Sequence, residues 1–341
     1  MSSSKRIEYI DLAKGICIFL VVFNHISQEG FFCNGNYPMK NIFDQMRMPL
    51  YFILSGLFFK DYAGGIKEFL LRKVNRILIP YIFFYSILRL ASRLVEEYTD
   101  FASTGAVIDK IWAPIWFLRC LFIMNGIFVV AYYAIRRFNM SGLMSEVLLG
   151  ACMITIGIIG YPLGNMRLAI GTALTCMPYL WLGYILNRKL HFLQRKIPWW
   201  CAIAFAIALF ALVHYMHLGE NLYFMNEYNS PITLLYLSGF AGTLAVLLLS
   251  SVIKWMPIIS YIGRYSIIVL CTHMLIVTLL VAAIHYLPEP CRGRGYLESF
   301  IFLAIVIALS MLCIWFLKKY LPWFTAQKDL IKVSNQQIQA S

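Results

Sequence analysis

The sequence has few charged residues, and acidic ones are especially scarce. Asp, Glu, Lys and Arg make up 13% of the 341 residues, whereas soluble globular domains carry about 25%. Hydrophobic residues reach 61%, more apolar surface than the core of a water-soluble domain can bury. This balance excludes a soluble enzyme, a disordered chain and a coiled coil, and it predicts a polytopic membrane protein.

The apolar residues form long runs rather than alternating ten-residue segments, which indicates helices instead of a barrel. A span needs about 20 mainly apolar residues, so we expect an all-α bundle of about ten transmembrane helices. The predicted spans are 7–26, 43–59, 77–95, 113–135, 143–161, 167–186, 198–217, 231–253, 258–287 and 298–320. The weakest breaks lie between the fifth and sixth spans and inside the long ninth. We expect one transmembrane domain over 1–324 and a short cytoplasmic tail over 325–341.

Basic residues are distributed unevenly along the chain. The sequence has 29 Lys and Arg against 16 Asp and Glu. With the N-terminus inside, roughly three times as many of the basic residues in the loops fall on the inner side as on the outer side. This asymmetry predicts that both termini are cytoplasmic. Loop charges that face lipid headgroups also explain the net charge without a nucleic-acid partner.

The first predicted helix carries three polar residues on one face. Lys14 and His25 are eleven residues apart, which at about 100° per residue is roughly 20° from three full turns. Asp11 precedes Lys14 by three residues and joins that face. A charge inside a span costs at least ~2.5–3.5 kcal/mol, so the alignment favours a functional face over a neutralising pair beside an interfacial histidine.

A second basic cluster consists of Arg72, Lys73 and Arg76, just before the apolar part of the third span. Basic residues at a cytoplasmic helix end are common topology anchors. They also suit phosphate groups, because Arg and Lys make charge-assisted hydrogen bonds with anions. The pattern alone supports both interpretations equally. In the preceding span, the Ser55-Gly56 pair predicts close helix packing.

The motifs in these spans resemble those of the membrane acyltransferase 3 family. The family's pattern of a basic residue, ten intervening residues and His matches Lys14 to His25. The other matching motifs, in chain order, are Tyr9–Gly15, Pro49–Gly56, Arg72–Ile77 with Pro80 and Tyr81, Trp116–Leu118, and Gly263–Ser266 leading to His273. The chain is most similar to stand-alone sugar O-acetyltransferases such as relatives of fucose 4-O-acetylase. It departs from many members at Lys14, where they have Arg, and at Lys73, where they have the first of two arginines.

The resemblance implies transfer of an acetyl or other acyl group from a cytoplasmic thioester to a hydroxyl of a cell-envelope glycan or its lipid-linked precursor. Acetyl-CoA would be a substrate rather than a resident cofactor, and no metal is expected. His25 would be a general base or carry a transient acyl group. Lys14 would hold the donor's arm or a developing oxyanion. The resemblance also implies a multi-pass protein of a bacterial cytoplasmic (inner) membrane. The candidate site residues are His25, Lys14 and Asp11 for catalysis, Arg72, Lys73, Arg76 and Ser55 for the donor, and Arg47, Trp116, Arg119 and His273 for the acceptor. Helix direction places Arg47, Trp116 and Arg119 in the outer half of their spans, which is why we expect them at the acceptor.

Several alternatives stay open at this level. A transporter or flippase without chemistry also places charges and broken helices inside the membrane, although no inverted repeat is visible. Arg47, Arg119 and Trp116 also suit interfacial anchors, and Asp44 is placed to pair with Arg47. Cys33 and Cys291 fall in predicted outer loops, where they form either a disulfide or two free thiols. The acceptor sugar and the oligomeric state cannot be read from the sequence.

Overall fold

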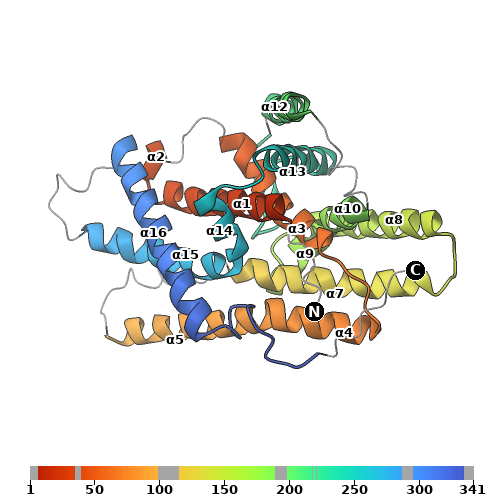
Figure 1. Ribbon diagram of the computed structural model, residues 1–341, viewed down its shortest axis with the longest axis horizontal. Coiled ribbons are helices and arrows are strands. Elements are labelled where there is room, and N and C mark those ends of the chain that lie inside the picture. The colour runs from red at the N-terminus through yellow and green to blue at the C-terminus, as the bar shows by residue number, and fades with distance from the viewer. Residues whose placement is uncertain are drawn as a thin grey trace.

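The chain folds almost entirely into helices (Figure 1). The computed structural model describes residues 7–34, 40–98, 115–188, 198–216, 218–219, 221–285 and 295–333. The elements are α1 (Glu8–Gln28), α2 (Phe31–Asn34), α3 (Lys40–Leu57), α4 (Gly65–Lys73), η1 (Val74–Leu78), α5 (Ile79–Tyr98), α7 (Trp116–Arg136), α8 (Gly142–Gly160), η3 (Tyr161–Leu163), η4 (Arg167–Ala169), α9 (Ile170–Thr175), α10 (Met177–Arg188), α12 (Trp199–Tyr215), β1 (Asn221–Leu222), β2 (Glu227–Tyr228), α13 (Ile232–Ile253), α14 (Pro257–Arg264), α15 (Ser266–His285) and α16 (Tyr296–Tyr320).

Each predicted span contains a helix, but fewer than ten are long and apolar enough to cross a membrane. Within the described residues, α1, α7, α8, α13, α15 and α16 meet that criterion. A seventh crossing is formed if the segments Arg167–Thr175 and Met177–Asn187, bent by 53°, count as one span. The prediction of a helical membrane protein is therefore confirmed, and six or seven described segments qualify as spans, whereas the count of ten stays a prediction. The long ninth span breaks at Tyr265, between α14 and α15, at the weak point noted in the sequence.

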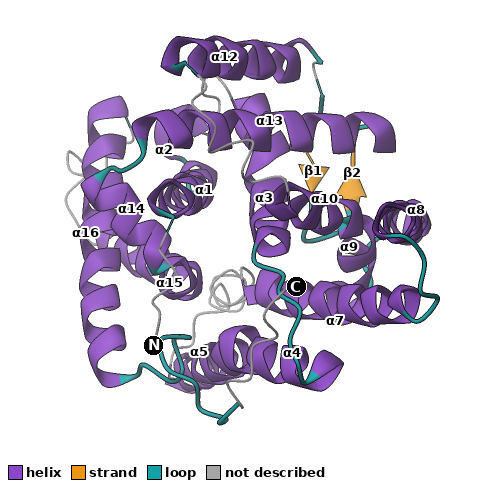
Figure 2. Ribbon diagram, turned by 45° about the vertical axis from the view of Figure 1, so that its right-hand side comes forward, coloured by secondary structure: helices purple, strands orange, loops and turns teal. Residues whose placement is uncertain are grey.

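Helix α1 lies inside the bundle, surrounded by α3, α13, α14 and α15 (Figure 2). Its contact with α14 is made through two glycines. A side chain at Gly15 would collide with the backbone carbonyl of Ile259, and one at Gly263 with that of Asp11. The two backbones can approach this closely only because both positions lack a Cβ atom. The helix that carries the predicted catalytic face is thus packed closely against α14 along its N-terminal half.

A similar contact joins α3 to α10. Side chains at Gly56 and Gly183 would collide with the backbone carbonyls of Leu180 and Ile53, respectively. This confirms the close packing predicted from Ser55-Gly56. It also fixes Ser55, the neighbour of Gly56, relative to the rest of the bundle.

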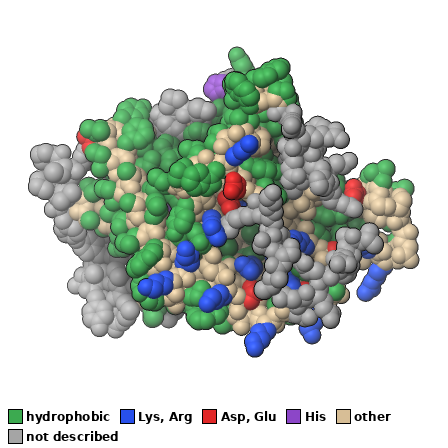
Figure 3. Space-filling model, in the orientation of Figure 1, with side chains coloured by type: hydrophobic (Ala, Val, Ile, Leu, Met, Phe, Trp, Pro, Cys, Tyr) green, Lys and Arg blue, Asp and Glu red, His purple; other side chains and the backbone are tan. Residues whose placement is uncertain are grey.

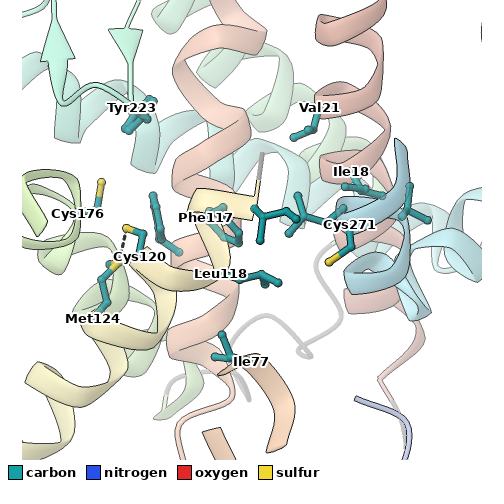
Figure 4. Close-up of a cluster of buried hydrophobic side chains, with 14 of the residues drawn as sticks. Ile18, Val21, Ile77, Phe117, Leu118, Cys120, Met124, Cys176, Tyr223 and Cys271 are labelled. Atoms are coloured by element: carbon teal, nitrogen blue, oxygen red, sulfur yellow. Dashed lines mark hydrogen bonds between the residues drawn. The ribbon is translucent and has the colours of Figure 1, made fainter. Parts of the chain in front are cut away.

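The largest core cluster is centred on the first turn of α7. Phe117 and Leu118 are almost fully buried and belong to the same cluster as Ile18 on α1 and Cys271 on α15. Figure 4 shows these side chains of α1, α7 and α15 in one cluster, together with Ile77 of η1. The core therefore connects α1, α7 and α15 with the helix that carries the second basic cluster.

The break between α9 and α10 is held by the short hairpin of β1 and β2. Asn226, between the strands, donates from Nδ2 to the Gly160 carbonyl at 2.9 Å, and its Oδ1 accepts from Thr175 Oγ1 at 2.9 Å. These bonds satisfy polar groups at a point where helical bonding is interrupted. The side chains of Cys33 and Cys291 lie outside the described part of the chain, so the proposed disulfide stays a prediction.

After α16 the chain turns back over the bundle. Residues 321–333, here named the C-terminal strap, run beside α5 and η1. Phe324 stacks on Phe83 of α5 with ring centroids 4.3 Å apart, and Thr325 is fully buried. The first part of the predicted tail therefore packs against the same helix as the second basic cluster.

Candidate functional site

A cavity of about 560 Å³ lies between α1, α3, α4, η1, α7, α15 and the C-terminal strap. Five of the predicted site residues line it, although up to 62 positions separate them in the sequence. They are Lys14, Ser55, Arg72, Lys73 and Arg76. The fold thus brings the basic end of the first predicted face and the second basic cluster to one cavity.

Arg72 is held by two neighbours. Its Nε and Nη2 donate to Glu68 Oε1 at 3.0 and 2.7 Å, and its guanidinium lies 4.5 Å from the centre of the Tyr62 ring. Glu68 is itself buried and accepts the Gly64 backbone N–H through Oε2 at 2.9 Å. Since both partners are fixed, the guanidinium is oriented before any ligand binds.

Arg76 lies in a π-helical segment, η1, where the helix takes one extra residue per turn. This changes the angle between Arg76 and the preceding α-helical turn that carries Arg72. Its Nη1 donates to the Ala326 carbonyl at 2.8 Å, and its Nε is 3.4 Å from Asp329 Oδ1. Segments of this kind are frequent at functional sites.

Two lysines complete the basic side of the cavity. Lys14 Nζ lies 4.0 Å from the centre of the Phe58 ring, and Lys73 Nζ lies 5.1 Å from that of Phe69. Lys73 ends α4, before the apolar part of the next helix. Burial and the nearby Lys14 ammonium lower the pKa of Lys73 to about 8. An anion bound between the two lysines would relieve their repulsion.

The opposite wall of the cavity is apolar and deeply buried. It includes Phe117, Leu118 and Leu121 of α7 and Leu270 of α15. Leu118 and Leu270 are 1% and 6% exposed, whereas the Arg76 side chain is 54% exposed. The cavity therefore has a charged, solvent-facing side and an apolar interior. From Leu270, His273 is three residues further along α15, or ~4.5 Å along the helix axis.

His273 contacts His25, with ring centroids 5.3 Å apart. His273 is fully buried, and its Nδ1 is 2.9 Å from the Val269 carbonyl. A carbonyl only accepts, so Nδ1 carries the proton and Nε2 presents a lone pair. Within the described structure that Nε2 has no hydrogen-bond partner. His25 Nδ1 pairs with Gln28 Oε1 at 3.1 Å, which by the same reasoning leaves its Nε2 as a base.

The remaining predicted residues lie elsewhere. Arg47 forms a 2.8 Å ion pair with the buried Asp44, as its sequence spacing suggested. Trp116 packs edge-on against Phe117, and Arg119 has a buried Nε without a partner among the described residues. None of Arg47, Trp116 and Arg119 lines the cavity, nor does Asp11, whose backbone carbonyl meets Gly263.

Several residues that line the cavity were not predicted from the sequence. Lys60 adds a fifth positive charge, Asp329 adds the one negative charge among the lining residues, and Tyr51 and Ser266 add hydroxyls. Lys60 gave no signal beyond that of a loop charge, and Asp329 lies in the predicted tail. On the face shown in Figure 3, Lys and Arg side chains gather mostly in the lower half, apart from the hydrophobic surface at the left.

The described part of the chain thus combines a helical membrane bundle, a basic cavity with an apolar wall, and a contacting pair of imidazoles, of which His273 lies three residues beyond Leu270 of that wall. Neither His25 nor His273 lines the cavity itself. Residues 7–319 match the model of the acyltransferase 3 family, which is described as an acyltransferase domain. The match spans nearly the whole chain, so the protein belongs to this family of acyltransferases. Comparison with curated proteins and with solved structures finds no match.

Proposed function

We propose that the protein is an O-acyltransferase that transfers an acetyl group from cytoplasmic acetyl-CoA to a hydroxyl of a cell-envelope glycan or its lipid-linked precursor. The observation that carries this proposal is the single cavity that joins Lys14, Arg72, Lys73 and Arg76 to an apolar wall ending one helical turn from His273. Family membership favours acyl transfer over the alternative of a transporter.

The chemistry of acetyl-CoA fits both sides of the cavity. Its phosphate groups suit the solvent-facing basic side, where Arg72 and Arg76 supply oriented N–H donors. Its pantetheine arm is thin and flexible and suits the apolar wall of Phe117, Leu118 and Leu270. The volume of about 560 Å³ lies within the ~300–1,000 Å³ typical of small-molecule sites.

The imidazole pair supplies the chemistry. His25 Nε2 takes the proton of the acceptor hydroxyl as its oxygen attacks the thioester carbonyl carbon. The carbon–sulfur bond then breaks, and the CoA thiolate takes the proton back from the imidazolium. His273 Nε2 accepts a hydrogen bond from a hydroxyl of the acceptor and so holds it beside His25. Lys14 lies far from this point on α1, so we assign it to the donor's arm and not to the oxyanion.

The orientation of the protein completes the proposal. Lys14 of α1, the C-terminal end of α4 and the C-terminal strap meet at one cavity, which is consistent with both termini lying on the same side of the membrane. The positive-inside rule makes that side cytoplasmic, where acetyl-CoA is found. His25 is then nearer the outer side, from which an envelope glycan would reach it. Arg47, Trp116 and Arg119 belong to this outer half, and Arg119 is the residue we assign to an anionic carrier.

The test uses inverted and right-side-out membrane vesicles that contain the protein. Radiolabelled acetyl-CoA is supplied outside the vesicles, and label in the glycan and lipid fractions is measured. We expect labelling in inverted vesicles only, and a loss of ~10²–10⁴-fold in the His25→Ala variant because a general base is removed. The matched control is His214→Ala, since His214 lies on the exposed side of α12 away from the cavity.

Two results would contradict the proposal. Equal labelling by wild type and His25→Ala would remove the imidazole from the reaction. Labelling from right-side-out vesicles alone would place the donor cavity on the opposite side of the membrane. Free CoA thiol, measured in the same samples, separates transfer to an acceptor from hydrolysis by water.

A further inference from the structure

The side chain of Asn75 in η1 makes three hydrogen bonds to the C-terminal strap. Asn75 is fully buried. Its Oδ1 accepts the backbone N–H groups of Leu330 and Ile331 at 3.0 and 2.9 Å, and its Nδ2 donates to the Ile331 carbonyl at 2.8 Å. A buried carboxamide that makes three bonds to a segment about 255 positions away is a specific clamp.

The same strap holds the guanidinium of Arg76. The Ala326 carbonyl accepts from Nη1, and the Asp329 carboxylate lies beside Nε. Ala326 adopts φ +59°, a left-handed conformation that is unfavourable for a residue with a side chain. The surrounding contacts must outweigh this cost. Strain of this kind is often found at functional sites.

The strap therefore lies between two adjacent residues of η1. Asn75 bonds to the strap at Leu330 and Ile331. The strap in turn contacts the guanidinium of Arg76 through Ala326 and Asp329. Asp329 also lines the donor cavity, so the strap forms part of the cavity wall. Its contacts use Nη1 and Nε of Arg76, and we assign the remaining nitrogen, Nη2, to the donor.

We propose that Asn75 is a positioning residue of the donor site: by clamping the strap, it aims Arg76 at the phosphate groups of the acyl donor. The inference rests on the proposed function, because it takes the ligand of Arg76 to be the donor's phosphate. It adds that a residue without contact to the donor sets the donor's affinity. It also makes residues 326–331 part of the binding site rather than a dispensable tail.

An opposite role for the strap makes an opposite prediction. If Asp329 competed with the donor for Arg76, release of the strap would strengthen donor binding. If the strap positions Arg76, release weakens binding because the guanidinium must be ordered at the moment of binding. The sign of the change in affinity therefore decides between the two roles. Misfolding could not imitate the competing role, since it would not strengthen binding.

The experiment measures CoA binding to the full-length protein in detergent by titration calorimetry. We expect Asn75→Ala to raise the Kd for CoA about tenfold, and Asn75→Asp, which keeps the two acceptor bonds, to lie between wild type and Asn75→Ala. In an Arg76→Ala background, Asn75→Ala should have no further effect, because it acts through Arg76. The control is Gln327→Ala, a strap residue whose side chain bonds only locally, to the Thr325 carbonyl at 2.9 Å.

Trypsin cleavage after Lys328 reports the strap itself, without any ligand. Asn75→Ala should be cut several-fold faster than wild type or Gln327→Ala. If wild type binds CoA and Asn75→Ala binds it equally well or more tightly, this inference is overturned while the proposed function stands. If wild type does not bind CoA, the donor assignment falls and takes the inference with it. Additive effects of Asn75→Ala and Arg76→Ala would also overturn the positioning role.

Discussion

The donor cavity and the imidazole pair use two different kinds of physical chemistry. The cavity gathers five basic side chains on a partly exposed surface, and each of Lys14, Arg72 and Lys73 rests on an aromatic ring. The pair consists of His25 and the fully buried His273, oriented by an amide and a backbone carbonyl. Charge therefore holds the ligand at one place, while fixed lone pairs act at another.

This difference predicts different kinetic effects for substitutions in the two regions. Phosphate binding is spread over several contacts, each worth about 1.5–3 kcal/mol when the partner is charged. Losing one contact weakens binding but leaves the reacting atoms in place. A base acts through one nitrogen, so its loss lowers the rate and not the affinity. Variants in the cavity should therefore raise the donor KM, and variants of the pair should lower kcat.

The strongest effect expected from the cavity is that of Arg72→Ala. We expect the donor KM to rise ~10–100-fold with kcat little changed, since one charge-assisted contact to phosphate is lost. Initial rates at varied acetyl-CoA check this. A fall in kcat with the donor KM unchanged would show that Arg72 acts in the chemical step and not in donor binding.

Arg72→Ala also leaves its buried partner without a counter-charge, which needs a control. Glu68 is 6% exposed and is paired with Arg72 at 2.7 Å. An unpaired buried carboxylate is strongly destabilising. The double variant Glu68→Gln/Arg72→Ala removes that charge, and it should keep the raised donor KM while recovering the amount of folded protein.

The next effect concerns the imidazole pair. His273→Phe keeps an aromatic ring beside His25 but removes the Nε2 lone pair. We expect about a tenfold loss in kcat/KM for the acceptor, typical of one lost hydrogen bond, and an unchanged Kd for CoA. His273→Gln, whose Oε1 can accept at a similar position, should recover part of the loss. Unchanged acceptor kinetics in His273→Phe would limit His273 to packing.

The two regions also differ in how well the sequence predicted them. The helix period placed Lys14 and His25 on one face of the first helix, and the small pair Ser55-Gly56 predicted close helix packing, which the structure shows between α3 and α10. These predictions concern local geometry, which a short stretch of sequence determines. The basic cluster at 72–76 was ambiguous by pattern, and its place in the cavity became evident only from the fold.

The parts that could not be predicted depend on contacts between distant segments. The π-helical turn at Val74–Leu78 changes the direction of the Arg76 side chain relative to Arg72, and no residue pattern in the sequence predicted this turn. The Asn75 clamp joins positions about 255 apart, and Asp329 lay in a segment that looked like a plain tail. Six or seven described segments meet the criterion for a span, rather than the ten predicted, partly because α12 is only 17 residues long and the chain bends between α9 and α10.

The smallest expected effect is a pH dependence that belongs to the cavity alone. Lys73 has a pKa lowered to about 8 by burial and by Lys14. The lysine is charged below that pH and neutral above it, so donor binding should weaken as pH rises through 8. The second ionisation of a phosphate monoester has a pKa near 6, so the phosphate groups of the donor are almost fully ionised above pH 7 and contribute little to the change in this range.

We expect the donor KM to rise about threefold to tenfold between pH 7 and pH 9, because the charged fraction of Lys73 falls roughly tenfold per unit above its pKa. Lys73→Arg keeps its charge throughout and should flatten the profile, while Lys14→Ala should shift the rise to higher pH by removing the neighbouring positive charge. The acceptor KM should not change over this pH range, and the Kd of Gln327→Ala for CoA should rise with pH as it does in wild type. A rise of the same size in Lys73→Arg would show that another group titrates, and it would remove Lys73 from the donor site.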